Sequence, residues 1–308
     1  MAIDSHRLPL LVLALALAGC GGGRNGSPPV SFPRLQELLS KGWQVREDVR
    51  EPPYRAVSLA NTTSEPAVDG LENLYRVLLY RTTDSGQARL VREWGYEDDY
   101  YQVCDPGFYD VTGLGHKAFS FTRSMGGNAW CNESIRVFQL DGDNVLEITP
   151  RGLPKTWVVQ SLQDVDGDGG CELLVLVADY EFYTFHCHAA SPGCDRIYCW
   201  DKHEGRFLDK SRQFRNYYEA DIKHYRQRQK DVLADPHHRN DEGGGYFSGA
   251  AISILLDYWC MDRTKEGWTE FSKDMSRLKA TASKERLREI RDMETDLHKR
   301  LGTQKLSK

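Results

Sequence analysis

Hydrophobic and polar residues alternate in short runs through most of the segment between residues 54 and 209. Alternation with a period of two, in runs rich in aromatic and branched side chains, predicts β-strands that bury one face. Turns rich in Gly, Asp and Asn separate the runs, which is typical of strands joined by tight connections. The predicted strands are residues 54–59, 74–80, 88–94, 118–122, 135–140, 145–149, 157–162, 173–177, 182–187 and 196–200. This segment is therefore expected to form an antiparallel β domain.

After residue 209, apolar residues recur at helical spacing instead. The predicted helices are residues 214–233, 246–261, 267–278 and 284–301, with a short helix near the N-terminus at 35–41. Residues 246–261 are apolar on nearly every side, which favours a central position in a small bundle. The predicted fold class is α+β, with an antiparallel β domain followed by a C-terminal helical bundle.

The first residues have the features of an export signal. Arg7 supplies positive charge, an apolar run follows at residues 8–18, and small residues precede Cys20. The run is too short to cross a bilayer as a mature helix. Leu17-Ala18-Gly19-Cys20 resembles a bacterial lipobox, which implies that Cys20 is acylated, with palmitate as the type of chain, and becomes the mature N-terminus. An ordinary signal peptide with an unrelated Cys is the alternative.

Composition changes again after the signal. Gly, Ser and Pro dominate the next residues, which predicts a flexible tether. We expect a lipoprotein signal peptide at 1–19, a tether at 20–33, the β domain at 34–210 and a helical region at 211–308. No second apolar run is long enough to span a membrane, so the acylated Cys20 is the expected contact with the lipid bilayer. In the lipoproteins that the signal resembles, a residue other than Asp after the Cys favours the outer membrane of the bacterial envelope, and Gly21 stands there.

A loop of alternating acidic residues carries the clearest candidate chemistry. Asp164, Asp166 and Asp168 are followed by a glycine pair, by Glu172 and then by an apolar strand. Side chains at alternate positions of a tight loop can direct their oxygens to one point, and Ca²⁺ prefers roughly six to eight oxygen ligands at flexible geometry. The flanks are strands and the twelfth loop position is Val175, so the loop is not an EF-hand. A solvated acidic turn without metal is the alternative.

This loop resembles the calcium loop of FG-GAP repeats, the blades of integrin-like β-propellers of the VCBS type. The resemblance covers the loop and the strand after it. It implies that one Ca²⁺ is held, in a structural role, by the carboxylates of Asp164, Asp166, Asp168 and Glu172 and by the carbonyl of Gly170.

An internal repeat extends the resemblance weakly. Residues 110–118 align with residues 164–172, keeping the first Asp and both matching glycines but lacking the other carboxylates, so this copy is not expected to bind metal. Val68-Asp69-Gly70 is a possible third, more eroded copy. Three copies are too few for a closed propeller, so the β domain is expected to be a partial propeller-like array or a sandwich.

The sequence contains eight cysteines, of which Cys20 is the expected lipid attachment site. In an exported protein the remaining seven imply disulfides and one odd thiol. The candidate pairs, chosen from their proximity along the chain and between strands, are Cys104 with Cys131, Cys187 with Cys194, and Cys171 with Cys199. Cys260, in an apolar helical stretch, is expected to be a buried free thiol.

Two histidine groups invite comparison with a transition-metal site. His186 and His188 flank Cys187, and His237-His238 follows the first long helix. We do not favour zinc here, because Cys187 is expected to be oxidised and His237-His238 falls in a polar loop.

Function is the least determined property. The net charge of −5 gives no indication of nucleic-acid binding, and no known nucleophile, phosphate-loop or metalloprotease motif is present. We expect an envelope-anchored lipoprotein that binds a protein or glycan partner rather than an enzyme. The alternatives are a hydrolase of cell-wall or extracellular polysaccharide and a structural component of envelope assembly. A pocket with two carboxylates away from the calcium loop favours the hydrolase, and a broad apolar patch on the helices favours assembly.

Overall fold

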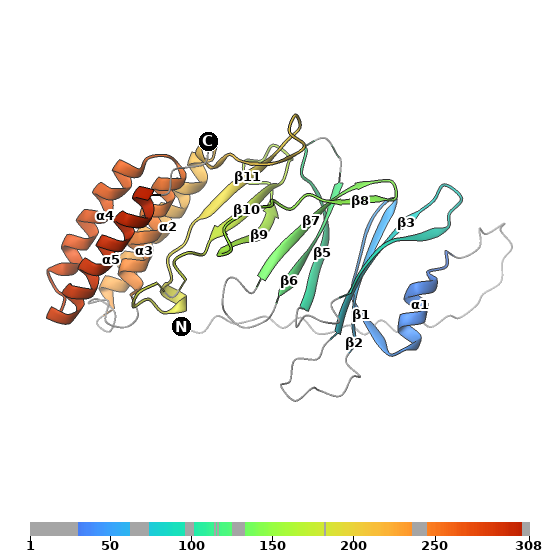
Figure 1. Cartoon of the computed structure of the whole chain (residues 1–308), viewed down its shortest axis with the longest axis horizontal. Helices are drawn as coiled ribbons and strands as arrows, with labels where there is room; N and C mark the ends of the chain where they lie inside the picture. Colours follow the sequence, from blue (N-terminus) through green and yellow to red (C-terminus); the bar gives the residue numbers. More distant parts are fainter. Residues whose placement is uncertain are drawn as a thin grey trace.

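Three antiparallel four-stranded sheets precede a bundle of helices, which confirms the predicted α+β class (Figure 1). The computed structural model describes residues 30–61, 74–95, 102–113, 115, 117–124, 133–181, 183–235 and 245–303. The first sheet contains β1 (Trp43–Glu51), β2 (Tyr54–Asn61), β3 (Leu74–Thr82) and β4 (Ala88–Gly95). The second contains β5 (Gln102–Asp110), β6 (Lys117–Ser124), β7 (Glu133–Asp141) and β8 (Asn144–Glu147). The third contains β9 (Trp157–Gln163), β10 (Glu172–Val177), β11 (Asp195–Asp201) and β12 (Arg206–Asp209).

Each sheet is a meander in which strands pair in chain order. The sheets stack face to face, and alternate residues of one strand serve two different cores. Phe119 and Phe138 face the first sheet, where the Phe138 ring lies 4.8 Å from that of Trp94. Val137, from the same strand as Phe138, faces the third sheet and packs in a cluster with Val175.

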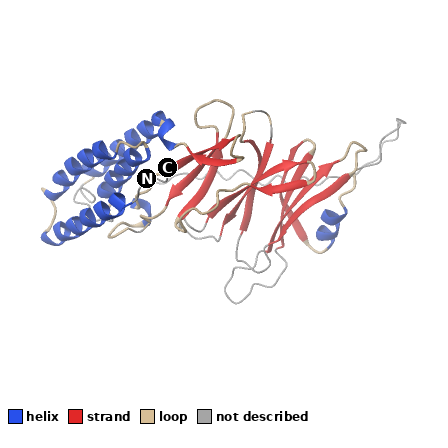
Figure 2. Ribbon diagram, turned by 45° about the horizontal axis from the view of Figure 1, so that its top comes forward, coloured by secondary structure: helices blue, strands red, loops and turns tan. Residues whose placement is uncertain are grey.

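The ends of the stack are covered by helices. Helix α1 (Pro33–Ser40) places Leu35 and Leu38 on the outer face of the first sheet. At the other end, the bundle covers the outer face of the third sheet, so the molecule is a row of layers (Figure 2). Because β10 is covered on both faces, all six of its residues are buried. This explains why residues 173–177 of the strand form a continuous apolar run rather than an alternating one.

The bundle contains α2 (Arg215–Ala234), α3 (Tyr246–Cys260), α4 (Thr264–Lys279) and α5 (Lys284–Thr303). All but two of the 15 residues of α3 are buried, which confirms its predicted central position. Gly249 allows α3 to lie against the short helix η2 (His188–Ala190), because a Cβ at this position would lie 2.0 Å from the carbonyl oxygen of Ala190. Within the described residues, no helix combines the length and apolar character needed to cross a bilayer.

The strand predicted at 182–187 is wrong for residues 183–187, which form turns. Their aromatic composition is typical of strands, but the side chains pack into the bundle instead: the Tyr183 hydroxyl donates to Asp296 of α5 at 2.6 Å. The strand β1 was missed because its sequence is mostly charged and one face is exposed.

The signal, the tether and Cys20 lie outside the described residues, apart from the last residues of the tether.

Candidate functional site

The predicted metal loop connects β9 and β10. One carboxylate oxygen from each of Asp164, Asp166 and Glu172 lies within 4.8 Å of the others, a group that could hold a metal ion. Gly167 and Gly169 adopt φ angles of 81° and 89°, a left-handed conformation that glycine reaches without strain. The loop therefore brings together three of its four predicted carboxylates.

Backbone N–H groups of the loop bind the same carboxylates. The amides of Gly167 and Gly169 donate to Asp164 at 2.7 and 3.1 Å. The Gly170 amide donates to Asp168 at 2.7 Å. Asp168 does not belong to the group of three, so this side chain serves the loop backbone in the present conformation.

Glu172 differs from the other acids because it is only 5% exposed. Burial is the main cause that raises the pKa of Glu172 to about 7, and the negative charges of the neighbouring aspartates raise it further. The Val165 amide donates a hydrogen bond of 2.9 Å to the Glu172 carboxylate, which lowers the pKa and so opposes these effects. A buried carboxylate beside further negative charges is costly unless a cation compensates it. Hard oxygen donors around this uncompensated charge fit Ca²⁺.

The aligned loop after Asp110 lies against the metal loop. The carbonyl oxygen of Asp110 accepts a hydrogen bond of 2.6 Å from the Cys171 amide. Its carboxylate accepts hydrogen bonds from the backbone and hydroxyl of Thr112, at 2.9 and 3.0 Å, and from the Gly115 amide. Burial raises the pKa of Asp110, but these hydrogen bonds outweigh it and the net pKa is lowered. The acid thus holds its own turn, and the two related loops pack together where the second and third sheets meet.

The third copy proposed at residues 68–70 lies outside the described residues. It falls between the second and third strands of its sheet, whereas the other two loops join first and second strands. The hairpin at Asp141–Asn144 is a plain turn between β7 and β8.

A second acidic site lies between the third sheet and the bundle. A cavity of about 390 Å³ is bounded by η2, the start of β11 and one side of α2, and Asp195, Tyr217, Asp221, Tyr225 and Arg228 line it. The hydroxyl of Tyr217 donates to Oδ2 of Asp195 at 2.8 Å. The other oxygen of Asp195 is buried and has no hydrogen-bond partner among the described residues.

Burial dominates the acid chemistry of this cavity. Burial raises the pKa of Asp195, although the hydrogen bond from Tyr217 acts in the opposite direction and lowers it. It also raises the pKa of Asp221 to about 6, with a further contribution from the charge of Asp195. Nearby in α3, Asp257 is fully buried at 0% exposure, and burial, followed by the charges of Asp221, Cys260 and Asp195, raises its pKa far above the usual range. The site and its surroundings therefore combine three buried acids whose pKa values are all raised above the ordinary range.

Sequence reasoning missed this cavity. Its residues come from β9, β10, η2, the start of β11 and α2, which only the folded chain brings together. One signal was visible in the sequence. Asp257 interrupts a predicted helix that is otherwise strongly apolar, and burying an acidic side chain is costly, so its position marks an unusual environment.

The described histidines of these two groups, His186 and His188, contact other residues of the chain. Nε2 of His186 lies 2.9 Å from the Ser248 hydroxyl, and its Nδ1 lies against the Tyr183 carbonyl oxygen. His188 pairs with Glu181 at 3.2 Å. His237 and His238 lie outside the described residues.

The cysteines are arranged differently from the candidate pairs. Cys194 contacts Cys260, with the two Sγ atoms 3.2 Å apart, rather than Cys187. Cys171 packs against the core between the second and third sheets, while Cys199 packs against the bundle. The structure therefore does not bring Cys171 and Cys199 together, because they lie on opposite faces of one sheet. These described cysteines are all free thiols, and the side chains of Cys104 and Cys131 lie outside the described residues.

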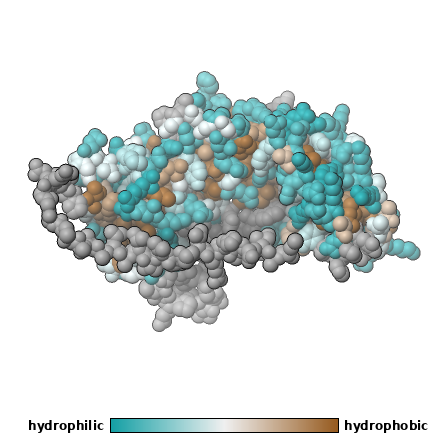
Figure 3. Space-filling view, turned by 180° about the vertical axis from the view of Figure 1, so that it is seen from behind, coloured by the Kyte–Doolittle hydropathy of each residue, from teal (hydrophilic) through white to brown (hydrophobic). Residues whose placement is uncertain are grey.

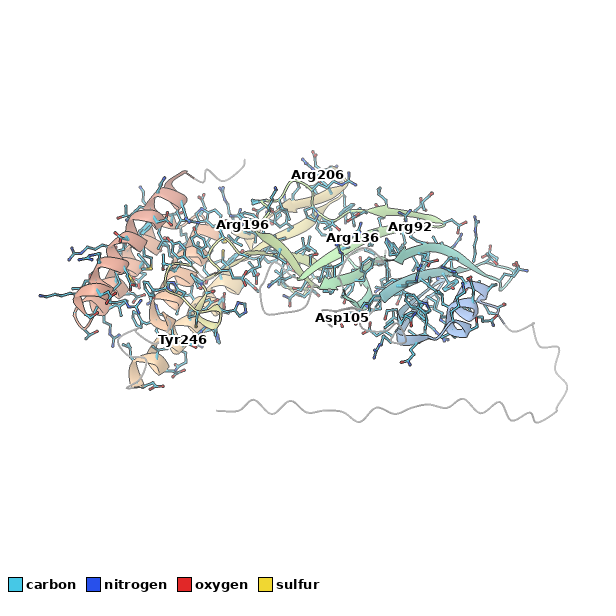
Figure 4. The ribbon with its side chains drawn as sticks, turned by 60° about the horizontal axis from the view of Figure 1, so that its bottom comes forward. Arg92, Asp105, Arg136, Arg196, Arg206 and Tyr246 are labelled. Atoms are coloured by element: carbon cyan, nitrogen blue, oxygen red, sulfur yellow. The ribbon has the colours of Figure 1, made fainter. Side chains whose placement is uncertain are left out.

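Large apolar side chains that are exposed in the described part of the chain are Val30, Leu39, Val45 and Leu146, all outside the bundle. On the face shown in Figure 3, apolar areas are small and separated by hydrophilic ones. Polar and apolar side chains together line a groove of about 930 Å³, in which residues 146–153 face β12. Arg206 lies at this groove and Arg196 lies nearer the helices (Figure 4).

No model of a known protein family matches the sequence, and no curated protein is significantly similar to it. The resemblance to an FG-GAP calcium loop therefore depends on the residues of the loop itself.

Proposed function

We propose that this chain is an envelope-anchored lipoprotein that binds Ca²⁺ through the loop between β9 and β10 and uses its β domain to bind a protein or glycan. The observation that carries the calcium site is the convergence of Asp164, Asp166 and Glu172 within 4.8 Å, with Glu172 buried. The ion has a structural role, because its ligands come from one short loop and the start of the central strand β10. Asp168 and the carbonyl of Gly170 complete the ligand set after a small rearrangement of the loop.

The groove of about 930 Å³ beside β12 supports the binding role. Its lining includes Arg151, Arg206 and Glu204, side chains suited to polar recognition of a glycan or an extended peptide. Calcium fixes the third sheet, which supplies one wall of this groove.

Isothermal titration calorimetry with CaCl₂ tests the metal site. The wild-type protein is expected to bind one Ca²⁺, and Glu172→Gln is expected to weaken binding at least tenfold because it removes the buried charge. Asp201→Asn is the matched control, since Asp201 also accepts two loop amides, from His203 and Glu204, both at 3.0 Å, in the same sheet. Equal affinities for the two variants would reject the assigned ligand set.

A second candidate function is a hydrolase of cell-wall or extracellular polysaccharide. The observation that favours it is the cavity lined by Asp195 and Asp221, since glycoside hydrolysis needs one protonated and one ionised carboxyl group on either side of the scissile bond. Asp195 and Asp221 are the candidate pair, because burial raises the pKa of both carboxyl groups, that of Asp221 to about 6.

Release of reducing ends from peptidoglycan and from exopolysaccharide tests this candidate. Asp195→Asn and Asp221→Asn are expected to abolish release, while Asp231→Asn, an exposed position on the same helix, leaves it unchanged. Absence of release by the wild-type protein from both substrates, or activity that survives both substitutions, would reject the hydrolase.

A further inference from the structure

The two buried thiols of Cys194 and Cys260 lie where the third sheet meets the bundle. Their Sγ atoms are 3.2 Å apart, and the two residues are 3% and 0% exposed. Cys194 immediately precedes β11, and Cys260 is the last residue of α3. Thiols 66 positions apart in the sequence therefore meet inside the core.

Independent contacts hold both backbones in this arrangement. The carbonyl oxygen of Cys194 accepts a hydrogen bond of 2.9 Å from the Val177 amide. The neighbouring Gly193 amide donates to the Ser253 hydroxyl of α3 at 3.2 Å. On the other side, the guanidinium of Arg196 stacks 4.7 Å from the ring of Trp259. The strand and the helix are thus tied together on both sides of the sulfur pair, and no large movement is needed to join the sulfurs.

We infer that Cys194 and Cys260 are joined by a disulfide in the exported protein. Two thiols lose two protons and two electrons as the Sγ–Sγ bond forms. A second molecule that carries a disulfide is the oxidant. It accepts those electrons by thiol–disulfide exchange and is reduced to two thiols. This pairing replaces the candidate bridge from Cys187 to Cys194 and removes Cys260 from the role of free thiol.

The time of oxidation follows from burial. Thiolates carry out exchange, and burial, followed by the hydrogen bond with Cys260, raises the pKa of Cys194 well above its usual range. The bond therefore forms while α3 is still closing over the sheet, and the folded protein then protects it from reductants. The bridge also fixes Asp195, the next residue, at the wall of the acidic cavity.

Peptide mapping of the full-length protein tests the pairing. Reduced protein is refolded with glutathione disulfide, alkylated in denaturant, digested without reductant and analysed by mass spectrometry. The expected result is a peptide pair linked through Cys194 and Cys260. Alkylation of both residues, or a bridge from either one to another cysteine, would overturn the inference. Calcium does not enter this test, so its outcome is separate from that of the proposed metal site.

Variants provide a second measurement. Reduction with tris(2-carboxyethyl)phosphine in denaturant, followed by refolding in the same reductant, should lower the melting temperature of the wild-type protein, and of the control Cys199→Ser. The double variant Cys194→Ser/Cys260→Ser should melt at the same temperature with and without the reductant. If this double variant retains the reductant effect in full, the bridge lies elsewhere.

Discussion

Asp257 is expected to destabilise the folded protein, increasingly so as the pH rises. It is fully buried in the central helix, and neither of its carboxylate oxygens has a hydrogen-bond partner among the described residues. Burial and the nearby acids Asp221 and Asp195 raise its pKa well above the ordinary value. The folded protein therefore keeps a proton that the unfolded chain loses above pH ~4.

The direction in which stability changes with pH follows from the number of protons that the folded and unfolded states bind. Because the folded state binds the extra proton, the free energy of unfolding falls as the pH rises from the unfolded pKa toward the folded one. A difference of one bound proton changes the free energy of unfolding by about 1.4 kcal/mol per pH unit. Asp257→Asn keeps the size of the side chain and removes this ionisation. Relative to the wild type, the variant should therefore gain stability between pH 5 and pH 7, by up to about 2.7 kcal/mol.

Urea unfolding at pH 5, 6 and 7 measures this difference directly. Asp231→Asn, at an exposed position on α2, is the control, and its stability difference from the wild type should be the same at all three pH values. A stability difference between Asp257→Asn and the wild type that stays constant across the three pH values would refute the reasoning. So would a variant whose relative stability falls as the pH rises.

Four further outcomes are expected. Gly249→Ala should cost about 1–3 kcal/mol in urea unfolding, because its Cβ would meet the Ala190 carbonyl oxygen, and an unchanged midpoint would contradict that packing. Asp110→Asn should leave calcium affinity unaltered in calorimetry, since its carboxylate binds the amides of its own turn, and a lost binding equivalent would mark a real metal site. Cys20→Ser should abolish incorporation of labelled palmitate, and membrane retention of this variant in high salt would contradict the lipid anchor. Reduction of the Cys194–Cys260 bridge should cost about 4 kcal/mol on the chain-entropy estimate for a loop of 66 residues, and equal urea midpoints with and without reductant would oppose it.

The fold class was predictable because its signals are local. The apolar run that forms β10 and the all-round apolar character of α3 each specify a buried element without knowledge of its partners. The turn around Tyr183 was mispredicted because composition alone does not distinguish a strand from aromatic side chains that pack into a bundle.

Predicting the candidate sites from sequence depended on how far apart their residues lie along the chain. The acidic loop was visible because its residues are consecutive, although the structure gathers Asp164, Asp166 and Glu172 and turns Asp168 toward the backbone. The contact between Cys194 and Cys260 and the meeting of Asp195 with Asp221 at one cavity arise only when the third sheet docks on the bundle. Proximity along the chain favoured Cys187 as the partner of Cys194, and the tertiary contact favours Cys260.

The central claim is that calcium neutralises the carboxylates of the loop and ties it to β10. Thermal unfolding of the wild-type protein in 10 mM CaCl₂ and in chelator tests it most directly. A ligand that binds only the folded state at a hundredfold excess over Kd stabilises by about 2.7 kcal/mol, and a Kd on the order of 10⁻⁴ M is typical of the tighter extracellular calcium modules. The account predicts a melting temperature several degrees higher in calcium, with Asp201→Asn responding like the wild type and Glu172→Gln showing at most about half of the wild-type shift. Identical melting of the wild-type protein in calcium and in chelator would contradict it.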